Sequence, residues 1–351
     1  MSLIKIPGLI DVHVHLREPG ATHKEDFHTG SRAAIAGGFT FIIDMPNNPL
    51  PTVSRERLEE KINLSKEKAI CDVGFHFGTN GKNIDEFTYA IESPNVFGLK
   101  VYCNHTTGEM LIEDQKLLDN IFSAWNSEKP ILVHAEGSQL ITALSLSSRY
   151  NRRLHVCHIS QASEVELVRL AKKEGHRVTA GVCPHHLYLT KKAVEQMKGY
   201  AMMKPPLGDS NDVEALWNGL KDGTIDIVES DHAPHTKEEK QVDENGKTAF
   251  GVPGLETTLG LMYKGVADGR ISNNDVVKFL YTNPKKIFNI KEQGDTYVLL
   301  DPSVPYITGA DGYESKCGWS PFNGMTLYGK PQKVVLKGKI ILEDGIITDN
   351  K

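Results

Sequence analysis

The first apolar run of the chain reads Leu9-Ile10-Asp11-Val12-His13-Val14-His15-Leu16. It is short and rich in β-branched residues, which is typical of a buried strand. Seven similar runs follow, with longer segments between them, at residues 39–45, 72–78, 96–103, 131–135, 154–159, 177–182 and 225–229. Several intervening segments have helical periodicity. The alternation therefore predicts βαβ units around a parallel sheet, and eight units indicate a TIM-type (β/α)8 barrel.

The helical segments and the C-terminal region set the expected domain organisation. Helices are expected over residues 54–68, 114–125, 163–174 and 212–220, and after the eighth run over residues 255–267 and 274–288. From Thr296 onward the chain becomes rich in turns, with strand-like runs at residues 332–336 and 339–342. We therefore predict a barrel over residues 7–290 and a small β-rich appendage over residues 291–351, packed with the N-terminal residues.

Composition excludes several classes of function. The 351 residues carry 40 Lys and Arg against 45 Asp and Glu, a net charge of −5, so nucleic acid and anionic membranes are not expected partners. The sequence has neither a bilayer-length apolar run nor a secretory leader pattern. Its five cysteines are scattered and include no C-x-x-C pair, which argues against a disulfide framework. We expect a cytoplasmic protein.

Candidate metal ligands stand at the ends of separate runs. His13 and His15 are two residues apart and so share one side of a strand, and His134, His158 and Asp231 lie at or just after later runs. In a barrel, the C-terminal ends of the strands meet at one face. A single His at a strand end is more often structural, but the joint pattern favours a metal site. Imidazole and carboxylate ligands suit zinc, while iron, cobalt and manganese stay open.

Lys100 lies in the fourth run, in the same company. An ammonium group repels cations, and an ordinary strand lysine extends to solvent or pairs with an acid. If its amine reacts with carbon dioxide, however, it becomes an anionic carbamate whose two oxygens can bridge two metal ions. We interpret Lys100 in this way.

Six motifs carry a family resemblance over nearly the whole chain, in order. They are residues 7–20 around His13 and His15, Met45-Pro46-Asn47, Gly98-Leu99-Lys100-Val101-Tyr102, Pro184-His185-His186-Leu187, Pro205-Pro206-Leu207 and Ser230-Asp231-His232-Ala233-Pro234-His235. These motifs resemble those of the dihydroorotases, in the amidohydrolase superfamily. The early start resembles in particular the dihydroorotase domain of the animal multifunctional pyrimidine-synthesis enzyme.

The resemblance implies a binuclear zinc centre and a substrate site. His13, His15 and Asp231 would hold one ion, His134 and His158 the other, and carbamylated Lys100 would bridge them. The residues implied in substrate binding are Arg17, Asn47, His235 and, on a lid-like loop over residues 105–108, Thr106. Lys204 stands where the family often has Asn or Arg, and could meet a substrate carboxylate. Strand alternation aims Arg17 into the barrel mouth if the first strand extends that far.

The implied reaction is the reversible cyclisation of N-carbamoyl-L-aspartate to L-dihydroorotate plus water, in de novo pyrimidine biosynthesis. Asp231 would act as the acid and base. We also expect a homodimer and an association with aspartate carbamoyltransferase. Two alternatives stay open: another cyclic amidohydrolase, such as a hydantoinase or allantoinase, and a non-catalytic dihydroorotase-like partner subunit.

The chain departs from the animal-type pattern at one position. There a Glu helps to bind a third metal with the residue equivalent to Cys157, whereas Gly181 occupies the Glu position here. A third zinc is therefore doubtful. Cys183-Pro184-His185-His186 is interpreted as a structural turn, and His76 and His155 as structural residues.

Overall fold

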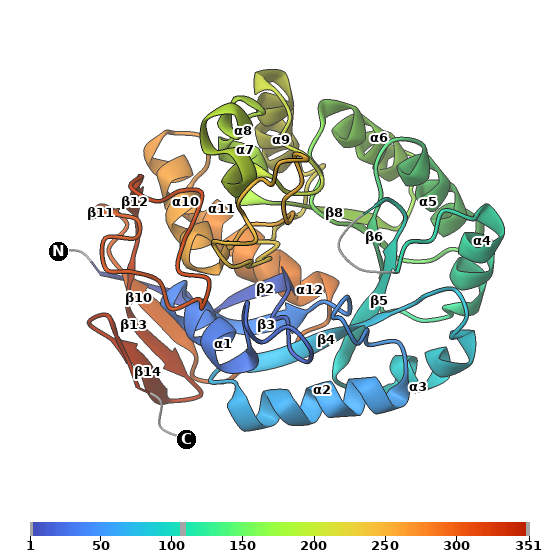
Figure 1. Ribbon diagram of the computed structural model, residues 1–351, viewed down its shortest axis with the longest axis horizontal. Helices are drawn as coiled ribbons and strands as arrows, with labels where there is room; N and C mark the ends of the chain where they lie inside the picture. Colours follow the sequence, from blue (N-terminus) through green and yellow to red (C-terminus); the bar gives the residue numbers. More distant parts are fainter. Residues whose placement is uncertain (1–2, 106–109, 349–351) are drawn as a thin grey trace.

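The computed structural model describes residues 3–105 and 110–348, and its centre is an eight-stranded parallel sheet (Figure 1). Each strand pairs with the next one along the chain. The strands are β2 (Leu9–Val14), β3 (Phe39–Asp44), β4 (Asp72–Gly78), β5 (Val96–Tyr102), β6 (Ile131–His134), β7 (Leu154–Val156), β8 (Val178–Val182) and β9 (Ile227–Val228). All eight lie within the predicted runs.

The sheet closes next to the end of β9. Val14, the last residue of β2, forms a parallel bridge with His232, and His15 N donates to His232 O at 2.8 Å. The backbone after β9 therefore completes the ring that β9 itself is too short to close. The predicted (β/α)8 barrel is confirmed.

Helices surround the strands (Figure 1). They are α1 (Phe27–Ala36), α2 (Arg55–Lys68), α3 (Phe87–Glu92), α4 (Gln115–Ala124), α5 (Ser138–Arg149), α6 (Ala162–Lys173), α7 (Pro184–Tyr188), α8 (Lys192–Met197), α9 (Ser210–Asp222), α10 (Leu255–Ala267), α11 (Asn273–Val277) and α12 (Asn283–Ile287), with short turns η1 (Ile84–Glu86), η2 (Lys198–Ala201) and η3 (Lys278–Thr282). Side chains of Asp26, Ser54 and Asp114 accept backbone N–H groups at the starts of α1, α2 and α4.

The last predicted helix, over residues 274–288, differs from the structure. The segment forms α11, the π-helical turn η3, and α12, which begins at Asn283. Pro284 lacks the N–H that a continuous α-helix would donate to residue 280, so the regular hydrogen-bond ladder cannot continue through it. The expectation of one unbroken helix was wrong.

A second, antiparallel sheet joins the two ends of the described chain. Its strand order is β1 (Ile4–Pro7), β10 (Tyr297–Leu300), β13 (Pro331–Leu336), β14 (Lys339–Glu343) and β15 (Ile346–Ile347). β11 (Pro305–Ile307) and β12 (Thr326–Tyr328) form a separate pair. Ile4 pairs with Leu300, so the N-terminal residues do pack with the β-rich region. The domain boundary at residue 290 stays a prediction.

The main apolar core lies between the strands and the helices that cover them. Leu99 of β5, Phe122 of α4 and Trp217 of α9 are buried in it. A smaller cluster brings Ile10, Val12 and Leu132 together with Phe288 just after α12. Within the described residues, no helix is both long enough and apolar enough to span a membrane.

Candidate active site

The predicted metal ligands meet at the C-terminal ends of the barrel strands. Asp231 Oδ1 lies 3.3 Å from His13 Nε2 and 3.0 Å from His15 Nε2. His134 Nδ1 lies 3.1 Å from His158 Nε2. The two groups adjoin, because the His13 and His158 rings have centroids 5.1 Å apart. Residues from four parts of the chain thus form one cluster.

Three site residues follow strand ends and have left-handed backbones. The φ angles are 64° at Arg17, 36° at His158 and 44° at Asp231. β2 ends at Val14, so strand alternation does not reach Arg17, and a turn aims its side chain instead. The condition for the expected alignment, a first strand that extends to Arg17, is therefore not met, although Arg17 does line the same cavity as the imidazoles. Non-glycine residues in this conformation cluster at functional sites.

The imidazoles are in a form that suits metal ions. Burial and the charge of Lys100 lower the pKa of His13 to about 4, and burial also lowers the pKa of His134, His15 and His158. These rings are therefore neutral near neutral pH, the state that coordinates metals.

Buried ring nitrogens without a hydrogen-bond partner also favour a metal site. Among the described residues, His13 Nδ1, His134 Nε2 and His158 Nδ1 are buried without a hydrogen-bond partner. Such a group costs about 1–3 kcal/mol, and a coordinated ion would offset that cost. The donor set fits the metal pair that the sequence predicts.

Lys100 is fully buried in the same cluster. Its Nζ donates to Cys157 Sγ at 3.1 Å and lies 5.0 Å from the centroid of the Tyr102 ring. Across residues 3–105 and 110–348, no carboxylate forms an ion pair with it. A buried ammonium group without a carboxylate is costly, and conversion to a carbamate beside cations would remove that cost.

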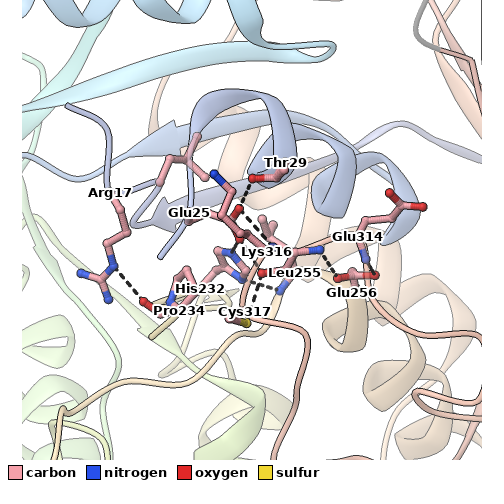
Figure 2. A network of polar contacts seen from close by, with 12 residues as sticks. Arg17, Glu25, Thr29, His232, Pro234, Leu255, Glu256, Glu314, Lys316 and Cys317 are labelled. Atoms are coloured by element: carbon pink, nitrogen blue, oxygen red, sulfur yellow. Dashed lines mark hydrogen bonds and ion pairs between the residues drawn. The ribbon is translucent and has the colours of Figure 1, made fainter. Parts of the chain in front are cut away.

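Four predicted substrate residues are described, and three of them line the cavity above the imidazoles: Arg17, Asn47 and Lys204. Asn47 Oδ1 lies 2.8 Å from His15 Nδ1. Arg17 Nε donates to Pro234 O at 3.1 Å, a bond drawn in Figure 2.

His235 lies behind Arg17. Its Nε2 is 3.2 Å from Arg17 Nη2, and its Nδ1 is 3.3 Å from both Lys24 Nζ and Glu239 Oε2. Burial, and then the charges of Arg17 and Lys24, lower the pKa of His235. The structure thus shows His235 as a neighbour of Arg17. The predicted contact of Thr106 lies outside the described residues.

Comparison with known proteins assigns the family. A family model described as "Amidohydrolase family" matches residues 4–341. The chain belongs to the amidohydrolase family. It is 35% identical over 388 residues to the dihydroorotase of Methanosarcina acetivorans, an alignment that covers 98% of this chain and 83% of that relative. It is therefore a dihydroorotase-like amidohydrolase.

Two further likenesses bear on this amidohydrolase. It is 40% identical over 353 residues to the multifunctional protein pyr1-3 of Dictyostelium discoideum, but it spans 16% of the length of that protein. The solved structure of an L-hydantoinase from Arthrobacter aurescens superposes with a TM-score of 0.91 at 27% identity, covering 98% of this chain and 86% of that one.

Glu229 is a site residue that sequence reasoning missed. It follows β9, is fully buried, and its carboxylate accepts from His158 N at 2.6 Å. Oε2 lies 3.6 Å from His13 Nδ1 and 3.4 Å from His155 Nε2. Glu229 therefore supports the backbone of His158, one of the predicted metal ligands, in this amidohydrolase. Its strand-end position was visible in the sequence, but its partners lie on or just after two other strands, β2 and β7.

Glu229 also explains Gly181. A Cβ at position 181 would lie 2.5 Å from Glu229 Oε1, so a Glu side chain there would collide with the carboxylate already present. Ligand-type atoms of His155, Cys157 and Glu229 lie within 4.8 Å of one another. The doubt about a third zinc stays a prediction.

Tyr102 is a second residue that was not assigned a role. It lines the cavity, and its hydroxyl is buried without a hydrogen-bond partner among the described residues. Burial raises the pKa of this phenol well above its usual value, so it is a proton donor at neutral pH. Tyr102 lies two residues after Lys100 on β5, and this spacing is the signal that would have found it.

A separate group of buried ligand-type residues adjoins the site. Cys183, His185 and His186 have ligand atoms within 4.8 Å of one another. Their segment is the start of the short helix α7 rather than a turn, with Pro184 at its first position, where proline's missing N–H is tolerated. His186 Nε2 donates to Pro205 O at 3.0 Å, which supports the structural interpretation of this segment.

Proposed function

We propose that this chain is a dihydroorotase, which reversibly converts N-carbamoyl-L-aspartate into L-dihydroorotate and water in pyrimidine biosynthesis. The proposal rests on one observation: Arg17 shares a cavity with the cluster of His13, His15, His134, His158 and Asp231. That cluster suits the opening and closing of a cyclic amide. Arg17 suits the carboxylate that dihydroorotate carries and that hydantoin and allantoin lack.

Two zinc ions complete the proposed centre. His13, His15 and Asp231 would hold one, His134 and His158 the other, with carbamylated Lys100 between them. Bound ions would acidify a water molecule and polarise the scissile carbonyl. Other divalent metals satisfy the same ligand types, and metal analysis of the purified protein distinguishes them.

Arg17 and Lys204 would orient the substrate. Pro234 O and His235 fix the Nε and Nη2 sides of the guanidinium group, and its planar fork can then receive a carboxylate with paired hydrogen bonds. Lys204 lines the other part of the cavity, beside the Phe250 ring at 4.8 Å. Its charge suits the second carboxylate, which exists only in the open-chain form. Asn47 and Thr106 would complete the substrate contacts.

Asp231 would carry the proton. Burial raises the pKa of its carboxyl group, with the His13 and Lys100 charges opposing, so a proton is held there more readily than on an exposed aspartate. In hydrolysis the carboxylate takes a proton from the attacking water and delivers it to the ring nitrogen as the C–N bond breaks. Cyclisation is the reverse.

A substrate panel tests the assignment. The zinc-loaded protein should turn over dihydroorotate and carbamoyl aspartate, and not hydantoin or allantoin. Arg17→Lys should lower kcat/KM for dihydroorotate by about 10–100-fold, because a charged bidentate contact contributes about 1.5–3 kcal/mol. Arg153→Lys is the matched control: Arg153 immediately precedes β7, and its side chain donates to Ile287 O and Glu128 O. Hydantoin turnover insensitive to Arg17→Lys would reject the proposal.

The likeness to an L-hydantoinase favours a second candidate, a cyclic amidase for substrates without a carboxylate. The same panel separates the two. A catalytically silent partner subunit is the third candidate. It would bind no zinc, whereas every predicted ligand residue is present here.

We also propose that the protein is a homodimer in the cytoplasm and acts beside other enzymes of pyrimidine synthesis, aspartate carbamoyltransferase among them. The multifunctional relative supports this context, and all five cysteines are buried and none is part of a disulfide, as suits a reducing compartment. Light scattering with and without the carbamoyltransferase tests both associations. A monomer that stays separate would contradict them.

A further inference from the structure

A buried carboxylate outside the metal cluster connects the C-terminal region to the active site. Glu25 precedes α1 and is fully buried. It accepts hydrogen bonds from the hydroxyls of Thr29 and Ser315 and, at 3.3 Å, from Lys316 N. On its other side, Oε2 lies 3.4 Å from His232 Nε2. Figure 2 shows Glu25 between the loop of Lys316 and the His232 ring.

The hydrogen bonds of His232 Nδ1 determine which ring nitrogen of His232 carries the proton. Nδ1 accepts from Gly254 N at 3.2 Å and Leu255 N at 3.4 Å, at the start of α10. An accepting nitrogen carries no proton, so the neutral ring is protonated on Nε2. Within the described chain, Nε2 has no hydrogen-bond partner, and the carboxylate that faces it is that of Glu25, at 3.4 Å. The ring is therefore held between α10 and Glu25.

The backbone of His232 contacts several segments that form the active site. Its N–H donates to Ser230 Oγ at 3.0 Å, and its carbonyl accepts from His15 N at 2.8 Å. The residue bridges Val14 on one side and Val252 on the other. The preceding residue is Asp231, with its left-handed φ of 44°. A shift of the His232 ring would therefore move both Asp231 and the backbone of His15.

The C-terminal segment that contains Ser315 and Lys316 is connected to His232 through Glu25. Glu256, in the first turn of α10, accepts from Glu314 N at 2.9 Å and from Ser315 N at 3.0 Å. That contact fixes the segment next to Glu25 without touching His232. Ser315 and Lys316, which lie 290 and 291 residues after Glu25, thus complete the surroundings of a carboxylate that faces His232.

We propose that Glu25 and His232 are positioning residues: Glu25, held by Ser315, fixes the His232 ring and so orients the Asp231 carboxylate toward His13 and His15. The proposal rests on the proposed function for its kinetic part. It makes Ser315, far from the cavity lining in sequence, a contributor to the active site.

Three variants separate positioning from loss of charge and loss of fold. Glu25→Ala removes the acceptor for His232. Glu25→Gln keeps an oxygen there and removes the charge. Asp212→Ala is the matched control, because this carboxylate also accepts two backbone N–H groups, those of Ala162 and Asp209, and has no contact with Glu25, Ser315 or His232. Should Glu25→Ala fail to fold, Ser315→Ala, which leaves Glu25 in place but unsupported, takes its place with the same expected direction.

The kinetic readout is the split between kcat and KM for dihydroorotate. Glu25→Ala should lower kcat by about 10–100-fold, the usual loss when support of a metal ligand is removed, with KM nearly unchanged. Glu25→Gln should recover most of that loss. Asp212→Ala should lower the melting temperature and leave kcat of the folded protein unchanged. Equal losses in Glu25→Gln and Glu25→Ala would overturn the proposal.

Two readouts do not need turnover. In ¹⁵N-histidine-labelled protein, His232 should show a protonated Nε2 and an unprotonated Nδ1, and its Nε2–H should exchange with water faster in Glu25→Ala than in the parent. Zinc retained after dialysis should fall in Glu25→Ala and not in Asp212→Ala. A parent protonated on Nδ1, or unchanged exchange and zinc retention, overturns the positioning role. A parent that binds zinc but has no dihydroorotase turnover rejects the proposed function alone.

Discussion

Two fully buried lysines, at the α2–β3 contact and at the barrel mouth, have opposite surroundings. Lys61 Nζ pairs with Asp44 Oδ2 at 2.7 Å and donates to Met45 O at 2.6 Å and Asn48 Oδ1 at 2.7 Å. Lys100 Nζ has one donated bond, to the thiol of Cys157. The first lysine has the carboxylate and oxygen acceptors that a buried ammonium group requires.

The difference indicates a structural role for Lys61 and surroundings that suit a chemical role for Lys100. Around Lys61, the burial that lowers the pKa of the lysine is opposed by the charge of Asp44. Around Lys100, the neighbours within the described residues include neutral imidazoles, a thiol and a phenol without a hydrogen-bond partner, and no carboxylate lies within ion-pair distance. Only the second environment would be completed by the carbamate and the cations that we propose.

Lys100→Ala should have the largest effect. We expect zinc content to fall below two per chain and kcat/KM to fall by at least about 10³-fold, because both water activation and carbonyl polarisation depend on the metal pair. Added short-chain carboxylates should restore part of the activity by supplying the missing bridge. Metal analysis and the dihydroorotate assay measure both. Two zinc ions and normal turnover in Lys100→Ala would show the two lysines to be alike.

Lys61→Met should affect stability instead. Loss of the lysine leaves Asp44 buried without its cation, which costs about 3–5 kcal/mol in the free energy of unfolding. The activity of the folded fraction should fall far less than in Lys100→Ala. Urea unfolding, followed with activity per folded molecule, checks this. A stability loss below about 1 kcal/mol would mean that the pair is not structural.

Much of this architecture was predictable because its signals are local. The eight strands were found from short β-branched runs, and the clustering of the His and Asp side chains from their place at the ends of those runs. The break at η3 depends on Pro284, whose effect competes with a helical pattern. The sequence predicted that Arg17 faces the barrel mouth, but it did not predict the left-handed turn at this residue.

The rest could not be predicted because it depends on contacts between distant segments. The position of the Glu229 carboxylate depends on β8, where Gly181 leaves room for it. Glu25 becomes meaningful only where Ser315 and His232 meet it. Glu25 also accepts from Thr29, four residues away, but the contacts that connect each carboxylate to the active site come from distant segments.

Tyr102→Phe tests the surroundings of Lys100 further. The hydroxyl has no partner in the described protein, so its removal should leave the free energy of unfolding unchanged or slightly higher. If the hydroxyl donates to substrate, kcat/KM should fall by about 3–10-fold, the effect of one neutral hydrogen bond. Paired unfolding and kinetic measurements check both. A large stability loss with no kinetic change would assign the phenol a structural role.

Lys240 offers a third buried lysine, with three carbonyl acceptors: Met202 O at 2.9 Å, Ala249 O at 2.6 Å and Gly251 O at 2.9 Å. Burial, then the charge of Arg17, lowers the pKa of Lys240 to about 7. Above that pH the unfolded chain holds a proton that the folded chain has lost. The free energy of unfolding of the parent, relative to Lys240→Met, should therefore rise from about pH 7 toward about pH 10. Parallel pH profiles of the two proteins would contradict the lowered pKa.

The most direct test is carbon-13 NMR of the zinc-loaded protein after exposure to ¹³C-bicarbonate. The account predicts one carbamate resonance in the parent and in Lys61→Met, and none in Lys100→Ala. A parent that binds two zinc ions without a carbamate signal, or a signal that persists in Lys100→Ala, would contradict it.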